Sequence, residues 1–330
     1  MAVARIAVVL LVAAVCATAA SATPDRRLPL RVVARVPLSG GAVRFDYTSI
    51  DPTRRRLWIS HMDAGELLAF DLRTRRIVKT ISAPGVHGVI AVPQVGRVYA
   101  SATNAREMLT IDARTGAVRA RARAGAYPDG LAFDTRERHV FVSDETGGVE
   151  AVFDAAGRRI ATVTLGGEAG NVQYDAKTGF VFVAVQTRSE IAIVDPRRNR
   201  VVRRVHVPGC VNDHGLLIDA AHRLAFVACD GNAKLLTLNL RTMRFTGTFS
   251  VGASPDVLAF DPGLRRLYVS AESGVVAVFA ERGRSARLLG RAYLAPEAHT
   301  VAVDPATHLV YFPLERGSGG RPELLIMRPA

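Results

Sequence analysis

A repeat of 41 to 44 residues runs from Asp46 to the C-terminus and leaves few architectures open to this chain. Each copy begins with a short apolar run, and the residues that close these runs are Asp51, Val92, Asp134, Asp175, Asp219, Asp261 and Asp304. Seven positions after each closing residue stands an aromatic: Trp58, Tyr99, Phe141, Phe182, Phe226, Tyr268 and Tyr311. Twenty positions after each of the first six stands a turn-forming or acidic residue: Asp71, Asp112, Asp154, Asp195, Asn239 and Glu281. Three offsets that recur in phase indicate seven copies of one structural unit.

Each copy consists of short β-branched and aromatic runs separated by Gly, Pro and Asp turns. A repeat of this length with four such runs is typical of a β-propeller blade. The sequence therefore predicts an all-β, seven-bladed β-propeller with four-stranded antiparallel blades. We place the blades near residues 44–84, 85–128, 129–169, 170–211, 212–255, 256–299 and 300–330, and we expect the repeated aromatics to fill the wedges between neighbouring blades.

The last copy has only three of the four runs, but the N-terminal residues 31–37 resemble the outer strand expected at residues 201–205. We therefore predict that residues 31–37 supply the outer strand of the seventh blade. Such a closure joins the two ends of the chain and removes an exposed sheet edge.

Residues 1–22 have the pattern of a cleavable signal peptide, with a basic start, an apolar run and small residues up to Ala22. We expect cleavage near Ala22, a single propeller domain at 23–330, and a periplasmic or secreted protein. The rest of the chain contains no apolar stretch of membrane-spanning length. Nothing in the sequence specifies a subunit contact, and we expect a monomer.

Two cysteines remain after the signal peptide, and both lie in the fifth copy. Cys210 precedes the inner strand of this blade and Cys229 ends the strand antiparallel to it. A disulfide between them is one hypothesis for an exported protein. Two free thiols, or a copper site shared by Cys210 and His214, are the alternatives.

Five residues before each closing residue, histidines and carboxylates recur. These positions are Asp46, His87, Asp129, Gly170 (with Asn171 next), His214, Asp256 and His299. In a propeller the entrances of the inner strands surround the channel mouth, so these side chains should converge there and form a ligand-binding site. His87, His214 and His299, with the carboxylates, could hold zinc, copper or calcium. The alternative is a ring of polar side chains that orders the strand entrances by hydrogen bonds.

The formal net charge is +13, and arginine runs occupy the turns expected on the opposite face. These runs could bind an anionic polymer such as DNA, with a strong dependence on salt. Aromatic residues interleaved for base stacking are missing from the same turns. A solvated basic face is the alternative.

Catalytic motifs such as Gly-x-Ser-x-Gly and His-Glu-x-x-His are absent from the sequence. This absence favours a non-catalytic propeller that binds a small molecule or a protein partner at the mouth. A metal-dependent hydrolase of the lactonase type is the alternative, with Asp46, Asp129 or Asp256 activating water next to a bound cation.

The segments RLYVS (266–270), IAIVD (191–195) and SPDVL (254–258) resemble the YVTN-repeat, YncE-like family of exported bacterial propellers. The resemblance implies seven blades and a periplasmic location, and DNA binding has been proposed for some members. Gluconolactonase-like propellers in the wider superfamily hold a divalent cation at the channel mouth. This chain differs from them because it has seven copies and a mouth rich in histidine.

Overall fold

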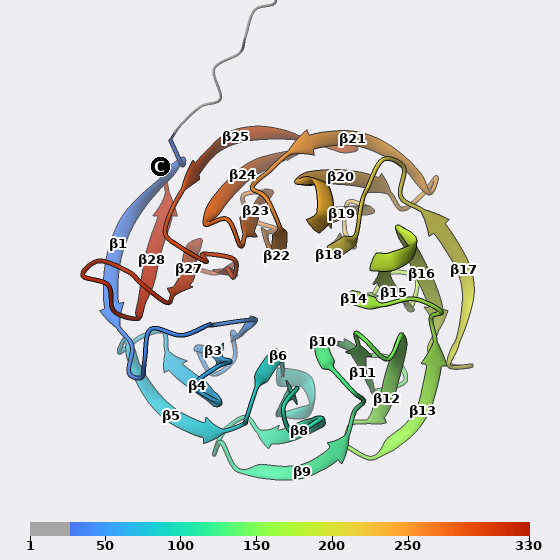
Figure 1. Cartoon of the computed structure of the whole chain (residues 1–330), viewed down its shortest axis with the longest axis horizontal. Helices are drawn as coiled ribbons and strands as arrows, with labels where there is room; N and C mark the ends of the chain where they lie inside the picture. Colours follow the sequence, from blue (N-terminus) through green and yellow to red (C-terminus); the bar gives the residue numbers. More distant parts are fainter. Residues whose placement is uncertain (1–26) are drawn as a thin grey trace, which may run out of the picture.

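The computed structural model describes residues 27–330, which form seven four-stranded antiparallel sheets around a central channel (Figure 1). The chain is thus a seven-bladed β-propeller, and the predicted fold class is confirmed. The predicted signal peptide at residues 1–22 lies outside the described residues. None of the helices in the described part of the chain is long and apolar enough to cross a membrane.

Each blade is built from the channel outward. The innermost strands are β2 (Thr48–Asp51), β6 (Val86–Val92), β10 (Pro128–Asp134), β14 (Ala169–Asp175), β18 (Asp213–Asp219), β22 (Pro255–Asp261) and β26 (Ala302–Asp304). The second strands are β3 (Arg56–His61), β7 (Arg97–Ala102), β11 (His139–Asp144), β15 (Phe180–Val185), β19 (Leu224–Cys229), β23 (Arg266–Ala271) and β27 (Leu309–Leu314).

The outer half of each blade follows the same order. The third strands are β4 (Glu66–Asp71), β8 (Glu107–Asp112), β12 (Val149–Asp154), β16 (Glu190–Asp195), β20 (Lys234–Asn239), β24 (Val275–Arg282) and β28 (Glu323–Pro329). The outermost strands are β5 (Arg76–Ser82), β9 (Val118–Arg123), β13 (Arg159–Thr164), β17 (Arg200–His206), β21 (Arg244–Ser250), β25 (Ser285–Tyr293) and β1 (Leu30–Pro37). Short 3-10 helices connect strands at η1 (Pro93–Val95), η2 (Gln186–Arg188) and η3 (Asp230–Asn232).

The closing residues of the sequence repeat are the last residues of the seven innermost strands. Most are aspartates because a carboxylate accepts hydrogen bonds from the backbone of the turn that follows. The Asp261 carboxylate, for example, accepts from the backbone nitrogens of Gly263 and Leu264 at 3.0 and 3.1 Å. The period in the sequence therefore records where each inner strand must stop and turn.

The hydrophobic core lies between the blades. Within residues 27–330 it divides into seven clusters, and each cluster draws its side chains from two neighbouring blades. The seven repeated aromatics all belong to these clusters, and each is at most 3% exposed. Their burial supports the predicted role of filling the wedges.

The seventh blade combines both ends of the chain, as predicted. Strand β1 pairs antiparallel with β28, from Leu30 opposite Pro329 to Pro37 opposite Glu323. Figure 1 shows this closure where the blue β1 lies along the red β28. No blade of the described ring is left with three strands.

Candidate functional site

The predicted mouth residues lie at β-bulges where the innermost strands begin. In five blades the pairing with the second strand shifts over one to two residues at this point, and the unpaired stretch contains His87, Asp129, Asn171, His214 or Asp256. A bulge turns a side chain away from the regular pleat, here towards the mouth. Asp46 and His299 precede the shorter strands β2 and β26 of the other two blades.

Glycines next to the mouth residues allow neighbouring bulges to come close together. A Cβ atom on Gly88 would lie 2.2 Å from the carbonyl oxygen of Asp129. A Cβ atom on Gly215 would lie 2.5 Å from the carbonyl oxygen of Asp256. Both distances are impossible for real atoms, so glycine is required where one blade's bulge meets the next.

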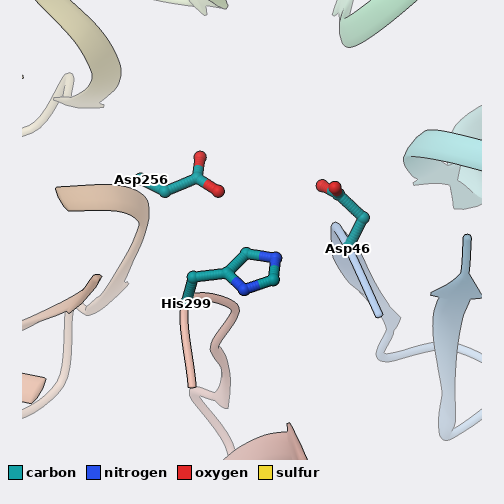
Figure 2. Close-up of side chains that lie close together, drawn as sticks. All are labelled: Asp46, Asp256 and His299. Carbon is teal, nitrogen blue, oxygen red and sulfur yellow. The ribbon is translucent and has the colours of Figure 1, made fainter. Parts of the chain in front are cut away.

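Three of the predicted mouth residues come together on one side of the ring. One ligand atom from each of Asp46, Asp256 and His299 lies within 4.8 Å of the other two. Figure 2 shows the His299 imidazole between the two carboxylates, with the side chains coming from three different segments. All three residues are buried, at 1%, 8% and 0% exposure respectively.

The orientation of the His299 ring is set by the backbone. Its Nδ1 lies 2.9 Å from the carbonyl oxygen of Glu297, which only accepts, so Nδ1 carries the hydrogen. In the neutral ring, Nε2 then presents a lone pair. This buried nitrogen has no hydrogen-bond partner among residues 27–330.

His87 contacts Asp46 and lines the same cavity. Its Nε2 lies 3.2 Å from Asp46 Oδ2, and its Nδ1 lies 3.0 Å from the Thr103 hydroxyl. That hydroxyl donates to the carbonyl oxygen of Pro128 at 2.7 Å, so it accepts from Nδ1–H of the imidazole. Burial lowers the pKa of His87, but the carboxylates of Asp46 and Asp129 outweigh it and raise the pKa overall. The raised pKa favours the protonated ring, the form that pairs with the Asp46 carboxylate.

His214 stands beside Asp256 in the corresponding way. The distance from His214 Nε2 to Asp256 Oδ1 is 3.2 Å. Burial lowers the pKa of His214, but the Asp256 carboxylate dominates and raises that pKa to about 10. Burial raises the pKa of Asp256, but His214 lowers it by more, and the result is a pKa of about 2. His214 and Asp256 therefore form an ion pair. The angle between them is too poor for a hydrogen bond, so Asp256 Oδ1 has no hydrogen-bond partner within the described residues.

Arg44 links the two carboxylates and was not predicted from the sequence. Its Nε lies 3.3 Å from Asp46 Oδ2, and its Nη2 lies 3.9 Å from Asp256 Oδ2. The shortest contact of the guanidinium is with Glu272 at the rim, at 3.0 Å from Nη2 to Oε1. The arginine thus acts as an internal counter-ion for three carboxylates.

The Tyr47 side chain extends across the channel to Asn171. The Asn171 side-chain nitrogen donates to the Tyr47 hydroxyl at 2.7 Å and so connects the first blade with the fourth. Tyr47 lines both the mouth cavity, of about 230 Å³, and a channel cavity of about 290 Å³ on its other side. It therefore forms the floor of a cup. We name the mouth cavity the mouth cup; its lining is Arg44, Asp46, Tyr47, His87, Tyr127, Asp129, Glu145, Gln186, His214, Asp230, Pro255, Asp256 and Glu272.

The mouth cup has more carboxyl groups than cations. Its lining includes six Asp or Glu side chains, against Arg44, His87 and His214 on the basic side. Asp129 is 2% exposed, and its Oδ1 lacks a hydrogen-bond partner in the part of the chain that the structure describes. Burial raises the pKa of Asp129 to about 7, although His87 and His214 act to lower it. An acidic cup in a basic protein suits a cation.

The three histidines of the predicted metal site do not form one cluster. Within residues 27–330, His, Cys, Asp and Glu gather closely enough for a metal at Asp46/Asp256/His299 and at Asp219/His222/Glu281. His87 and His214 lie outside both groups, each beside a carboxylate. The separate pair Cys210 and Cys229 is joined by a disulfide in the structure, with Cα atoms 5.4 Å apart.

Sequence reasoning missed Arg44, Tyr47 and Tyr127. Tyr47 had a signal: the position after the mouth residue holds a smaller residue in five blades (Gly88, Gly130, Gly215, Val257 and Thr300), whereas Tyr47 and Asn171 are large and polar there. These two exceptions are the residues that meet across the channel. Arg44 and Tyr127 stand in loops where the sequence repeat offers no contrast.

No family model and no curated protein matches this chain. Among solved structures, it is similar to the WD40 repeats of RRP9, with a TM-score of 0.76 and 10% identity over 93% of this chain and 99% of that chain. It is also similar to U3-55K, with a TM-score of 0.75 and 10% identity over 92% and 99% of the two chains. Hydrazine synthase of Kuenenia stuttgartiensis has a TM-score of 0.75 and 12% identity over 86% and 95%. At these identities the likeness concerns the fold alone, and the chain is a β-propeller of the WD40-like architecture.

Proposed function

We propose that this protein binds a small, positively charged ligand in the mouth cup. The observation that carries the proposal is a cavity lined by six carboxyl groups and only three basic side chains, which Tyr47 closes from below. Buried charges are costly unless they are paired. A cation that enters the cup would balance the charge of the carboxyl groups that outnumber Arg44, His87 and His214.

The size and shape of the cup favour a small molecule over a protein surface. Its volume of about 230 Å³ is below the range of ~300–1,000 Å³ that is usual for ligand pockets. Tyr47 and Tyr127 line it, and aromatic rings attract ammonium groups. A compact organic ammonium ion therefore fits the chemistry of the cup.

Thermal-shift and calorimetric titrations with tetramethylammonium and putrescine test this proposal, with acetate and succinate as anionic counterparts. We expect the cations alone to bind. The variant Glu272→Gln at the rim should weaken their binding severalfold, while Glu137→Gln, at an exposed residue outside the cup, should not. Equal binding of cations and anions, or no binding of either, would refute the proposal.

We also propose that the protein is exported and that it is related to the YVTN-repeat family. The Cys210–Cys229 disulfide supports it, because such bonds persist mainly outside the cytoplasm. Fractionation of cells that express the full chain, followed by mass measurement of the mature N-terminus, tests both export and cleavage near Ala22.

Hydrolysis is a second candidate, favoured by Asp129. A buried carboxyl with a pKa of about 7 and an oxygen lacking a partner within residues 27–330 has the properties of a general acid or base. If the protein cleaves lactones or esters, Asp129→Asn should reduce the rate by about 100-fold or more. Turnover that is unchanged in this variant would exclude the role.

Binding of a polyanion through the arginine-rich face is a third candidate, supported by the net charge of +13. Several of these arginines are already paired: Arg54 contacts Asp51 at 3.0 Å and Arg265 contacts Glu281 at 2.8 Å. The face therefore attracts anions less strongly than its arginine count indicates. Affinity for duplex DNA that falls steeply between 50 and 200 mM salt would support this candidate.

A further inference from the structure

We propose that Asp46, Asp256 and His299 form a site for a divalent transition-metal ion of the zinc class at the edge of the mouth cup. The proposal deepens the function proposed above, because it assigns one cation to a defined set of ligands. It also replaces the three-histidine set that the sequence suggested. Figure 2 shows the three side chains with the space between them.

His299 provides the first argument. Histidine ligands of metals usually donate their other ring nitrogen to a carbonyl or carboxylate, which fixes the tautomer and turns the lone pair to the metal. His299 has this arrangement, with Nδ1 held 2.9 Å from the Glu297 carbonyl oxygen. Its Nε2 is fully buried and lacks a partner within residues 27–330, and Figure 2 shows it on the side of the ring that faces Asp46. An unpartnered buried polar atom is rare unless a ligand completes it.

The two carboxylates provide the second argument. Asp46 and Asp256 each contact a further histidine, His87 and His214 respectively, both at 3.2 Å. Those contacts hold the carboxylates in place in the way that outer partners hold metal ligands. The three ligand atoms lie within 4.8 Å of one another, whereas atoms bound to one zinc ion stand roughly 3–3.5 Å apart. A contraction of about 1 Å would complete the site.

The donor set identifies the class of metal. One imidazole nitrogen and two carboxylate oxygens suit zinc and its neighbours, while calcium requires six to eight oxygen ligands. Three protein ligands leave at least one coordination position open. Because Asp46 and Asp256 line the mouth cup, that position faces the cavity and is available to water or to a bound ligand.

Arg44 takes the place of the cation in the metal-free protein. Its guanidinium lies 3.3 Å from Asp46 and 3.9 Å from Asp256, but its shortest contact is with Glu272. Glu272 offers the arginine an alternative partner when a metal ion neutralises the other two carboxylates. Loss of the Arg44 charge should therefore strengthen metal binding.

The second cluster of the same residue types serves as an internal comparison. In the group of Asp219, His222 and Glu281, Nδ1 of the imidazole already lies 2.6 Å from Asp219. Glu281 is paired with Arg265 at 2.8 Å. Here the imidazole nitrogen that faces the carboxylates is already paired with Asp219, and His222 is exposed. This cluster has the residue types of a metal site, but its histidine lacks the buried, unpartnered nitrogen that His299 has.

The experiment is a calorimetric titration of Zn²⁺ into tag-free protein that has been stripped with a chelator. Mn²⁺, Mg²⁺ and Ca²⁺ are titrated in parallel. We expect one zinc site, weaker binding of Mn²⁺, and much weaker binding of Mg²⁺ and Ca²⁺. His299→Gln should lower the zinc affinity at least tenfold, whereas the matched variant His222→Gln should change it less than twofold.

The variant Arg44→Gln keeps the test decisive if other variants fail to fold, because we expect it to gain zinc affinity rather than lose it. We expect zinc to bind about tenfold more tightly to this variant than to the natural chain. The proposal is overturned if the natural chain binds no zinc at 1 mM, if His222→Gln rather than His299→Gln abolishes binding, or if Arg44→Gln weakens it. Zinc binding without ammonium binding would refute the organic ligand alone, and the reverse result would refute the metal site alone.

Discussion

Asp175 and Asp256 are both buried aspartates with cationic neighbours, and they lie at opposite ends of the innermost strands. At the far face, both oxygens of Asp175 contact Arg223 at 2.7 Å, and the turn supplies further donors from Lys177 and Thr178. At the mouth, Asp256 has His214 at 3.2 Å and Arg44 only at 3.9 Å. The first carboxylate is fully satisfied within the protein, and the second is not.

This contrast extends to the two faces as a whole. Carboxylates at the far-face turns recur in nearly every blade and accept hydrogen bonds from their own turns, as Asp71 and Asp112 do. Mouth residues alternate between carboxylate, imidazole and amide from blade to blade, and some of their buried atoms have no partner within residues 27–330. Repeated chemistry therefore stabilises the ring, and the departures from the repeat create a binding site.

The largest effect should come from removing the strand that closes the ring. A chain without residues 27–38 lacks β1, so β28 becomes an open edge of a three-stranded blade. We expect the loss of most of the ~5–15 kcal/mol by which such domains are stable. Circular-dichroism melting measures it, and an unchanged melting temperature would show that the ring closes without β1.

The second-largest loss of stability should come from Asp175→Ala at the far face. The change leaves the buried guanidinium of Arg223 without its carboxylate, and breaking a buried ion pair in this way costs about 3–5 kcal/mol. The matched control is Asp195→Ala, at a turn where the carboxylate is more exposed and the cost should be about 1 kcal/mol. Urea unfolding compares the two variants; equal losses would mean that the Arg223 pair adds nothing.

Glu150, in the third blade, should make stability depend on pH. Burial raises its pKa from 4.5 to about 8, partly offset by a hydrogen bond from Ser143. Between pH 4.5 and about 8 the folded protein keeps this proton, whereas the unfolded chain has lost it. The free energy of unfolding therefore falls as the pH rises through this range. Glu150→Gln stays neutral and should reduce that fall by about 2–4 kcal/mol. Parallel pH profiles of the two proteins would contradict the assignment.

The smallest effect on stability should come from His299→Gln. The ring makes one hydrogen bond, to the Glu297 carbonyl, and leaves Nε2 unused within the described residues. We expect the free energy of unfolding of the metal-free protein to change by about 1 kcal/mol or less. A loss as large as that of Asp175→Ala would mean that His299 is part of the framework, and the contrast between the faces would fail.

The fold was predictable because its determinants recur. Closing aspartates and wedge aromatics are dictated by the geometry of one blade, and seven copies reveal them without knowledge of contacts between blades. The mouth positions, too, could be located from their phase in the repeat. The contacts between the mouth residues could not be predicted, because they depend on side-chain directions at the strand entrances. His299 lies near Asp46 and Asp256. His87 and His214 each contact one of these carboxylates. Arg44 lies in a loop outside the repeat and carried no periodic signal.

The most direct test of the account is the ¹⁵N spectrum of the histidine side chains, recorded before and after one equivalent of Zn²⁺. We predict that zinc strongly shifts the Nε2 signal of His299, whose Nδ1 donates to the Glu297 carbonyl oxygen. The signals of His222 and His308 on the far face should stay in place, because both rings are already paired with carboxylates. An Nε2 signal of His299 that zinc leaves unmoved, or a shift at His222 in its place, would contradict the claim that the mouth is the binding face.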